Sequence, residues 1–99
     1  MYGISVRYEY DGPEQPWENV INAFIDAVNA DTELAGRFDY QVNIGRDGKS
    51  RVHWGRWDEP ATVERLQSRA YFREFSEALK TFAGDSLSPM PVAMYRRSD

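Results

Sequence analysis

Hydrophobic and polar side chains alternate along the first segment of the sequence. The even-numbered positions of residues 2–10 are apolar or aromatic, whereas Ser5, Arg7 and Glu9 occupy the positions between them. A period of two residues is typical of a β-strand with one buried face. The pattern therefore predicts a strand over this range, which ends at the turn residues Asp11-Gly12-Pro13.

The apolar positions of the next segment recur every three or four residues, which is the period of an amphipathic helix. They are Trp17, Val20, Ile21, Phe24, Ala27 and Val28. Pro16 precedes them, where the first turn of a helix tolerates a missing N–H group. The pattern predicts a helix that has ended by Gly36.

Two more alternating segments, residues 38–44 and 50–57, flank the sequence Gly45-Arg46-Asp47-Gly48-Lys49. The Asp-Gly pair within that sequence favours the positive backbone angles of a hairpin turn. We therefore expect the two segments to form antiparallel strands that pair with each other.

A second helical region follows these strands. Asp58 is placed as its N-cap, with Glu59 and Pro60 in the first turn, and Ser68 is placed to cap a further helical segment. The apolar stripe of that segment consists of Tyr71, Phe75, Ala78, Leu79 and Phe82, before a stop at Gly84. Residues 91–96 predict a last strand, and the prolines around its start are typical of a sheet edge.

The predicted order is βαββαβ, which is typical of an α+β, ferredoxin-like domain spanning residues 1–99. Such a domain has one four-stranded antiparallel sheet with its helices on one face. The other face is uncovered, and it meets either solvent, a ligand or a second copy. We expect it to carry Ser5, Arg7, Asp39, Gln41, Asn43, Arg51, His53 and Trp57.

Composition narrows the possible partners and cofactors. Twelve basic and 16 acidic residues give a net charge of -4, which argues against binding to nucleic acid or to anionic membranes. The absence of Cys and the single His argue against disulfides and a conventional zinc site, so we expect no metal. No apolar run is long enough to span a bilayer and no signal peptide precedes the first strand, so we expect a cytoplasmic protein.

The element order and several local sequences resemble one known superfamily. These sequences are Trp57-Asp58, Leu66-Gln67-Ser68, Ala70-Tyr71 and the helical segment from Phe72 to Phe82. Over nearly its whole length the chain resembles the dimeric α/β-barrel superfamily, and within it the antibiotic biosynthesis monooxygenase-like domains. The resemblance implies a homodimer, with a pocket in each subunit between sheet and helices and with Trp57 lining that pocket.

Several members of that family oxidise aromatic, polyketide-like compounds with molecular oxygen and without metal or flavin. The resemblance therefore implies no cofactor and a small aromatic ligand. Members that degrade haem carry an iron-ligating His on the helix after the strand-end Trp, whereas residues 65–68 of this chain contain none. The first strand also lacks a recognisable Asn, and Ser5 and Arg7 stand there instead.

Four residues are candidates for catalysis. His53, whose unperturbed pKa lies near neutrality, would take a proton. Arg7 would stabilise negative charge with help from Arg51, Trp57 would pack the substrate, and Tyr71 would be a second proton carrier. Other interpretations stay open. His53 can simply bond to a neighbouring strand or subunit, and the arginines can form ion pairs with acidic residues such as Asp39 or Glu9.

Aromatic side chains are expected to gather between the sheet and the helices, where they form either a tight core or the wall of a cavity. The residues predicted to bind substrate there are Tyr8, Trp17, Trp54 and Phe72, with Trp57 and Tyr71 as polar-tipped walls. Asp58 and Glu59 are interpreted as capping residues and not as an acid/base pair.

Two functions compete. The first is a small-molecule enzyme resembling cofactor-independent monooxygenases, acting on aromatic or enolisable substrates. The second is a dimeric binding or accessory module without chemistry. An open cavity that reaches Trp57 would favour the enzyme, and a filled interior would favour the module. RNA binding is disfavoured, because residues 51–57 lack the aromatic pattern of RNA-recognition domains.

Overall fold

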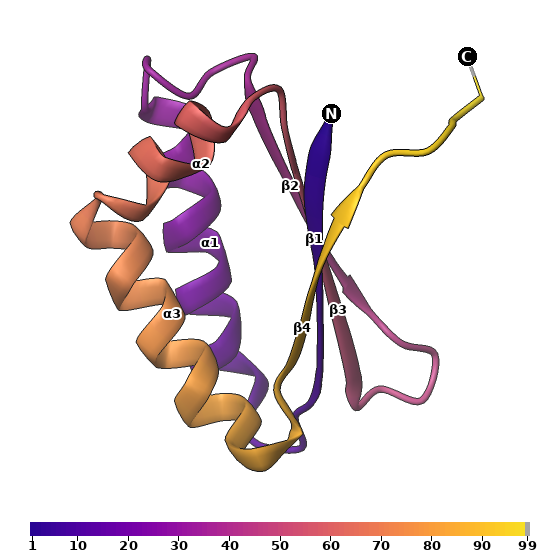
Figure 1. Ribbon diagram of the computed structural model, residues 1–99. Coiled ribbons are helices and arrows are strands. Elements are labelled where there is room, and N and C mark those ends of the chain that lie inside the picture. The colour runs from indigo at the N-terminus through magenta and orange to yellow at the C-terminus, as the bar shows by residue number, and fades with distance from the viewer. Residues whose placement is uncertain (99) are drawn as a thin grey trace.

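A computed structural model describes residues 1–98 of the chain. The chain forms its elements in the order β1 (Tyr2–Glu9), α1 (Glu14–Ala30), β2 (Phe38–Ile44), β3 (Ser50–Trp57), α2 (Pro60–Gln67), α3 (Ala70–Ala83), a short 3-10 turn (Gly84–Ser86) and β4 (Ser88–Ala93). Helices α1, α2 and α3 all lie on the same side of the sheet (Figure 1). No helix among these residues is both long and apolar enough to cross a membrane.

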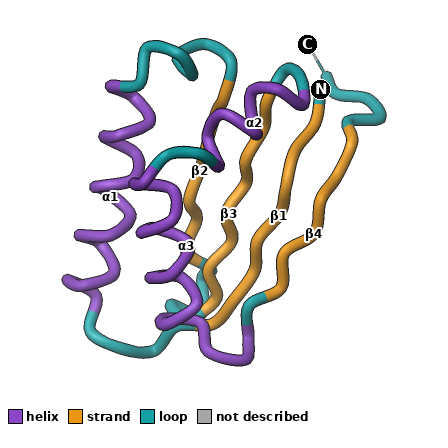
Figure 2. Tube along the Cα trace, turned by 60° about the vertical axis from the view of Figure 1, so that its left-hand side comes forward, coloured by secondary structure: helices purple, strands orange, loops and turns teal. Residues whose placement is uncertain are grey.

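The four strands form one antiparallel sheet in the order β2-β3-β1-β4, which Figure 2 shows from the helix side. The predicted ferredoxin-like α+β arrangement, with helices on one face, is therefore confirmed. The last strand begins three residues earlier than residues 91–96 predict, and it ends at Ala93. Its prolines occupy the sheet edge, where a strand can lack some N–H donors.

The core lies between the sheet and helices α1 and α3. The rings of Phe24 on α1 and Phe75 on α3 stack with their centroids 3.9 Å apart, and this contact joins the two helices above the sheet. The buried apolar residues are Val6, Tyr8, Trp17, Ile21, Phe24, Val28, Leu34, Phe38, Leu66, Phe75, Leu79 and Ala83. They come from β1, α1, β2, α2 and α3, with Leu34 from the connection between α1 and β2.

The prediction of which β3 side chains lie on the uncovered face is wrong. Arg51 pairs with Tyr8 and His53 pairs with Val6, so both side chains point toward the helices together with Trp57. Arg51 is 1% exposed and His53 is 0% exposed. Trp54, which was predicted to lie in the core, points to the uncovered face and is 50% exposed.

The beginning of α2 also differs by one residue from the prediction. The N-cap is Glu59, not Asp58. The Asp58 carboxylate still stabilises this helix start, because it accepts hydrogen bonds from the backbone N–H of Glu59 and the hydroxyl of Thr62. These contacts hold the pKa of Asp58 below its usual value, with the Thr62 bond as the main cause. The Asp58 carboxylate therefore has the structural role that the capping interpretation expects, whereas the Glu59 side chain makes no capping hydrogen bond.

Gly55 gives the side chain of Tyr40 room to lie across β3. A Cβ atom at Gly55 would stand 3.2 Å from the Tyr40 ring and 3.2 Å from Ile4, which is closer than ordinary van der Waals contact. A glycine in a strand interior often marks such a close approach. The Tyr40 ring can consequently reach from β2 to His53 on β3.

Replacing Gly55 by Ala tests this packing. We expect the Gly55→Ala substitution to lower the free energy of unfolding by about 1–3 kcal/mol, because the added methyl group displaces the Tyr40 ring. Ser5→Ala, on the uncovered face, is the control and should change stability by about 0.5 kcal/mol or less. Urea unfolding measures both. Equal stabilities of wild type and Gly55→Ala would contradict the proposed contact.

Candidate functional site

An open pocket of about 370 Å³ lies between the sheet and helices α2 and α3. Its volume falls in the range of ligand-binding pockets in proteins, roughly 300–1,000 Å³. Most of its wall is apolar. The lining residues are Ile4, Val6, Phe24, Phe38, Tyr40, Trp57, Val63, Leu66, Gln67, Phe72, Phe75, Ser76, Leu79, Lys80, Leu87, Pro89 and Pro91.

The sequence of β4 explains why this space is not filled. Pro91 pairs with Ile4 and Pro89 pairs with Val6, so the two prolines take the covered face of this edge strand. A proline ring is short and cannot reach a helix as a Leu or Phe side chain can. A gap therefore remains between β4 and α3, and it extends inward to Trp57.

A chain of hydrogen bonds runs through the core beneath the pocket. The indole N–H of Trp17 donates to the hydroxyl of Tyr8 over 2.9 Å. That hydroxyl lies 2.8 Å from Nε2 of His53, and Nδ1 of His53 lies 2.7 Å from the hydroxyl of Tyr40. We call these four residues the buried polar chain. Only its last member, Tyr40, lines the pocket.

Burial keeps the members of this chain neutral. Desolvation, with a smaller effect of the positive charge on Arg51, lowers the pKa of His53 to about 4. Desolvation also raises the pKa of Tyr8 and strongly raises the pKa of Tyr40. At neutral pH the imidazole is therefore uncharged, and both phenols keep their hydrogens.

Arg51 is fully engaged by other residues on the covered face. Its guanidinium forms two hydrogen bonds to Glu14, of 2.6 and 3.2 Å, and lies over the ring of Trp17 at 4.3 Å. This pairing lowers the pKa of Glu14. The prediction that the arginines form ion pairs holds for Arg51, although its partner is neither Asp39 nor Glu9.

The residues predicted to be catalytic do not converge on one place. Trp57 lines the pocket, whereas His53 lies behind Tyr40 and does not. Arg7 is exposed and alternates with Val6 and Tyr8, so it points to the uncovered face. The prediction that Arg7, His53 and Trp57 share a face is therefore wrong.

Tyr71 lies outside the pocket. Its hydroxyl donates to the carboxylate of Asp31 over 2.7 Å, and burial followed by this hydrogen bond raises its pKa to about 12. It lines a separate hollow of about 160 Å³ between α1 and α3. Arg69 also binds Asp31, at 2.9 Å, so this cluster joins the end of α1 to the start of α3.

Of the residues predicted to bind substrate, one is at the pocket. Phe72 lines it, whereas Tyr8 and Trp17 lie deeper in the core and Trp54 is on the other face of the sheet. Tyr40 was not predicted as a pocket residue. Gly55, one strand away, was the available signal, because a glycine in a strand leaves room for a neighbouring ring.

Among residues 1–98, no group of three or more His, Cys, Asp or Glu residues is arranged to hold a metal ion. The polar atoms around the pocket are donors of the kind that orient an organic ligand. Tyr40 and Trp57 come from strands, whereas Gln67, Ser76 and Lys80 come from helices. The chemistry of the site is therefore that of an apolar cavity with a few hydrogen-bonding groups.

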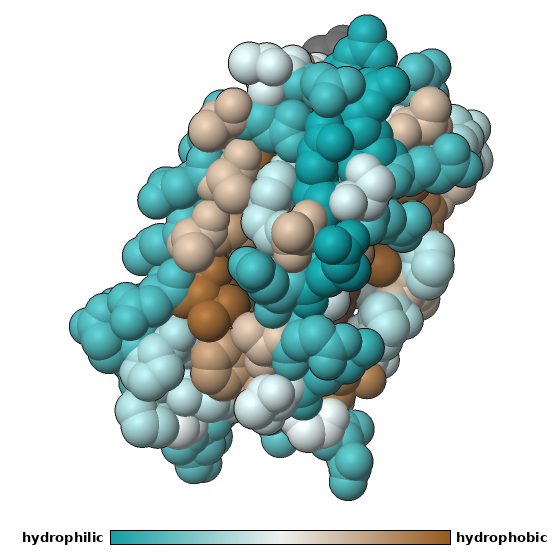
Figure 3. Space-filling model, turned by 90° about the vertical axis from the view of Figure 1, so that its left-hand side faces the viewer, coloured by the Kyte–Doolittle hydropathy of each residue, from teal (hydrophilic) through white to brown (hydrophobic). Residues whose placement is uncertain are grey.

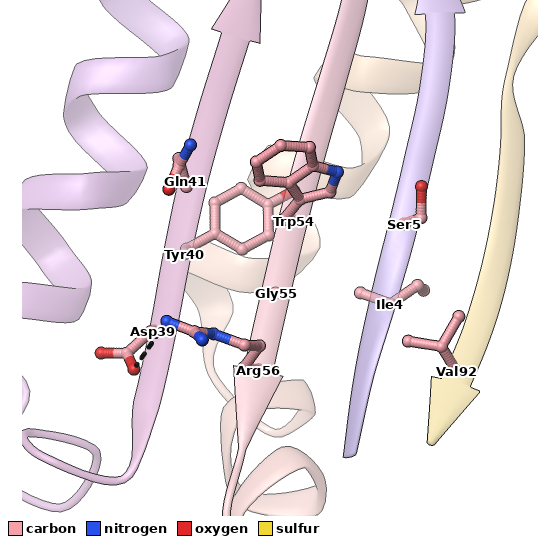
Figure 4. Close-up of a pocket in the computed structure, with 9 residues that line it drawn as sticks. All are labelled: Ile4, Ser5, Asp39, Tyr40, Gln41, Trp54, Gly55, Arg56 and Val92. Carbon is pink, nitrogen blue, oxygen red and sulfur yellow. Dashed lines mark ion pairs between the residues drawn. The ribbon is translucent and has the colours of Figure 1, made fainter. Parts of the chain in front are cut away.

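The uncovered face carries a second, wider hollow of about 700 Å³ between β2 and β4. Figure 4 shows Trp54 standing out from β3, with Arg56 reaching across to Asp39 on β2. The ion pair between Arg56 and Asp39 spans 3.8 Å. Met90 and Val92 on β4 are exposed large apolar residues of the same face. On the helix side, hydrophilic side chains surround a smaller hydrophobic patch (Figure 3).

Solved structures share this fold. The Mycobacterium tuberculosis protein Rv0793 matches with a TM-score of 0.79 and 10% identity, over 99% of this chain and 98% of that chain. SnoaB, a cofactor-independent oxygenase from Streptomyces nogalater, matches with a TM-score of 0.73 and 15% identity, over 97% and 94% of the two chains. An antibiotic biosynthesis monooxygenase matches with a TM-score of 0.68 and 11% identity, over 97% and 100%.

No protein-family model matches the chain. No curated protein matches it either. The chain nevertheless shares its fold with solved structures that include a cofactor-independent oxygenase and an antibiotic biosynthesis monooxygenase, in agreement with the fold that the sequence predicts. At these identities the likeness is one of fold.

The buried imidazole predicts a pH dependence of stability. The pKa of His53 is about 4 when folded and 6.5 in an unfolded chain, so below pH 6.5 only the unfolded state takes up this proton. The contribution to stability is complete above pH 6.5 and is lost as the pH falls toward 4. Between pH 7 and pH 5, wild type should lose about 2 kcal/mol more of its unfolding free energy than a His53→Gln variant.

Urea unfolding at the two pH values measures this difference. Wild type and the His53→Gln variant contain the same acidic residues, so the titration of carboxylates affects the stability of both proteins equally and cancels in the comparison. Parallel losses of stability in the two proteins would mean that His53 is accessible to protons in the folded state.

Proposed function

We propose that the protein is a homodimeric enzyme that binds a small aromatic or enolisable compound between its sheet and helices and oxidises it with molecular oxygen, without a cofactor. The observation that supports this most is the open apolar pocket that reaches Trp57. A filled interior would have favoured a module without chemistry. The shared fold with the oxygenase SnoaB adds support for the reaction type.

The wall of the pocket suits a flat, mainly apolar molecule. Aromatic rings from β3 and α3, Trp57 and Phe72, stand at the pocket together with the prolines of β4. Rings stack on aromatic substrates and exclude water from them, which protects a reactive carbanion or enolate. Of the residues that line the pocket in the described part of the chain, only Lys80 on α3 is cationic, and it pairs with Glu77, so the ligand is expected to enter as a neutral molecule.

His53 can take part only through Tyr40. Both of its ring nitrogens are occupied by tyrosine hydroxyls, and its low pKa makes it a weak base. Any proton that His53 moves to or from the ligand passes through the Tyr40 hydroxyl. Arg7 and Tyr71 have no place in this proposal, because neither lines the pocket.

The dimer is proposed from the uncovered face of the sheet. Trp54, Met90 and Val92 lie exposed there, and Trp54 borders the wider hollow. Exposed apolar groups gathered on one face commonly mark a protein interface. A second copy packed through the same face would cover these side chains and complete a barrel.

Oxygen consumption tests the enzymatic proposal. With a panel of polycyclic phenols and no added metal or flavin, the protein should consume oxygen, and Trp57→Ala should lower kcat/KM tenfold or more. Trp57→Phe should retain part of the activity, because it keeps an aromatic surface. Asn29→Ala, on the exposed side of α1, is the control. Binding without any oxygen uptake would instead identify an accessory module.

Charge placed on the uncovered face tests the dimer. We expect Met90→Asp and Trp54→Asp each to weaken self-association at least tenfold, because a two-fold interface would bury the new charge twice. Asn29→Asp adds the same charge on a helix and should leave the dimer intact. Size-exclusion chromatography with light scattering measures the mass. A monomeric wild type would refute the proposed assembly.

A further inference from the structure

The hydrogen bonds of the buried polar chain can run in one of two directions. The Trp17 indole only donates, so the oxygen of Tyr8 accepts its hydrogen. A neutral imidazole has one N–H and one free lone pair. His53 therefore either accepts from Tyr8 and donates to Tyr40, or donates to Tyr8 and accepts from Tyr40.

Each direction leaves the hydroxyl hydrogen of one tyrosine without an acceptor, and the tyrosine differs between the two directions. If His53 donates to Tyr8, the unused hydrogen belongs to Tyr8, which is 3% exposed and has only Trp17 and His53 as partners within residues 1–98. If His53 donates to Tyr40, the unused hydrogen belongs to Tyr40, which lines the pocket. A buried hydroxyl without an acceptor is disfavoured, whereas one at an open pocket can bind water or a ligand.

We propose that the Tyr40 hydroxyl, held from below by His53, donates a hydrogen bond to a carbonyl or enolate oxygen of the ligand. The inference rests on the proposed function and names the chemical feature by which the pocket selects its substrate. Tyr40 thus determines specificity, and His53 and Tyr8 are positioning residues. The raised pKa of Tyr40 supports this role, because the phenol stays a donor at neutral pH.

Two other donors at the pocket, Gln67 and Lys80, are less well placed to select an oxygen atom. Gln67 and Lys80 are exposed, and Lys80 pairs with Glu77 at 3.2 Å. The Tyr40 hydroxyl is fixed by its bond to His53 and by the ring position that Gly55 allows. A fixed donor discriminates between ligands more sharply than a flexible one, because it loses less freedom on binding.

The tautomer of His53 tests the direction of the chain without any ligand. The protein has a single His, so a long-range ¹H–¹⁵N correlation spectrum shows one imidazole only. We expect Nδ1 to carry the hydrogen and Nε2 to be unprotonated at pH 7. The opposite tautomer would overturn the inference, because the Tyr40 hydroxyl would then donate its hydrogen to Nδ1 of His53 and have none left for the ligand.

A matched pair of probes tests the selection itself. 1-Tetralone and tetralin have the same fused rings, and only tetralone carries a carbonyl group. Wild type should bind tetralone more tightly, and Tyr40→Phe should weaken tetralone binding by roughly 3- to 10-fold while changing tetralin binding less than twofold. The infrared carbonyl band of bound tetralone should shift to lower frequency in wild type and return in Tyr40→Phe.

Tyr10→Phe is the matched control, because its hydroxyl bonds to the backbone oxygen of Pro13 and Tyr10 does not line the pocket. If both probes bind equally well, or if the band shift persists in Tyr40→Phe, the inference is wrong while the proposed aromatic pocket stands. If neither probe binds, the proposed substrate class fails and the inference falls with it.

Discussion

The burial of Arg51 and His53 on the covered face of β3 is the constraint on which the rest of the structure depends. A buried guanidinium without a partner would cost several kcal/mol, and Glu14 and the Trp17 ring supply its partners. An imidazole buried among apolar side chains needs two hydrogen bonds, and Tyr8 and Tyr40 supply these. The start of α1 and the ring positions on β1 and β2 follow from these contacts.

The same constraint gives the pocket a polar floor inside an apolar wall. Tyr40 crosses Gly55 to reach His53, and Tyr40 also lines the space that the prolines of β4 leave open. A ligand in this pocket meets mainly rings and aliphatic groups. Proteins described as oxygenases share the fold. The polar floor follows from the contacts of this chain's own residues and not from that likeness.

The sequence was sufficient for the elements and their order, because one-sided burial produces periods of 2 and 3.6 residues that survive in β1, α1 and α3. The sequence was not sufficient to predict which side chains of β3 face the helices. There Val52 and Trp54 lie on the uncovered side, while Arg51 and His53 lie on the buried side. Glu14, the partner of Arg51, is 37 residues away along the chain. Tyr40 and Tyr8, the partners of His53, are 13 and 45 residues away. The hydropathy pattern of β3 alone therefore gives no sign of these contacts. Trp57 was placed at the pocket by family resemblance and Phe72 by the expected gathering of aromatic side chains, whereas Tyr40 was missed.

A crystal structure of the protein soaked with 1-tetralone tests the account most directly. The account predicts ligand density between the sheet and α3, against Trp57, with the carbonyl oxygen within hydrogen-bond distance of the Tyr40 hydroxyl. Density on the uncovered face beside Trp54 would contradict it, as would a space at Trp57 that side chains fill completely.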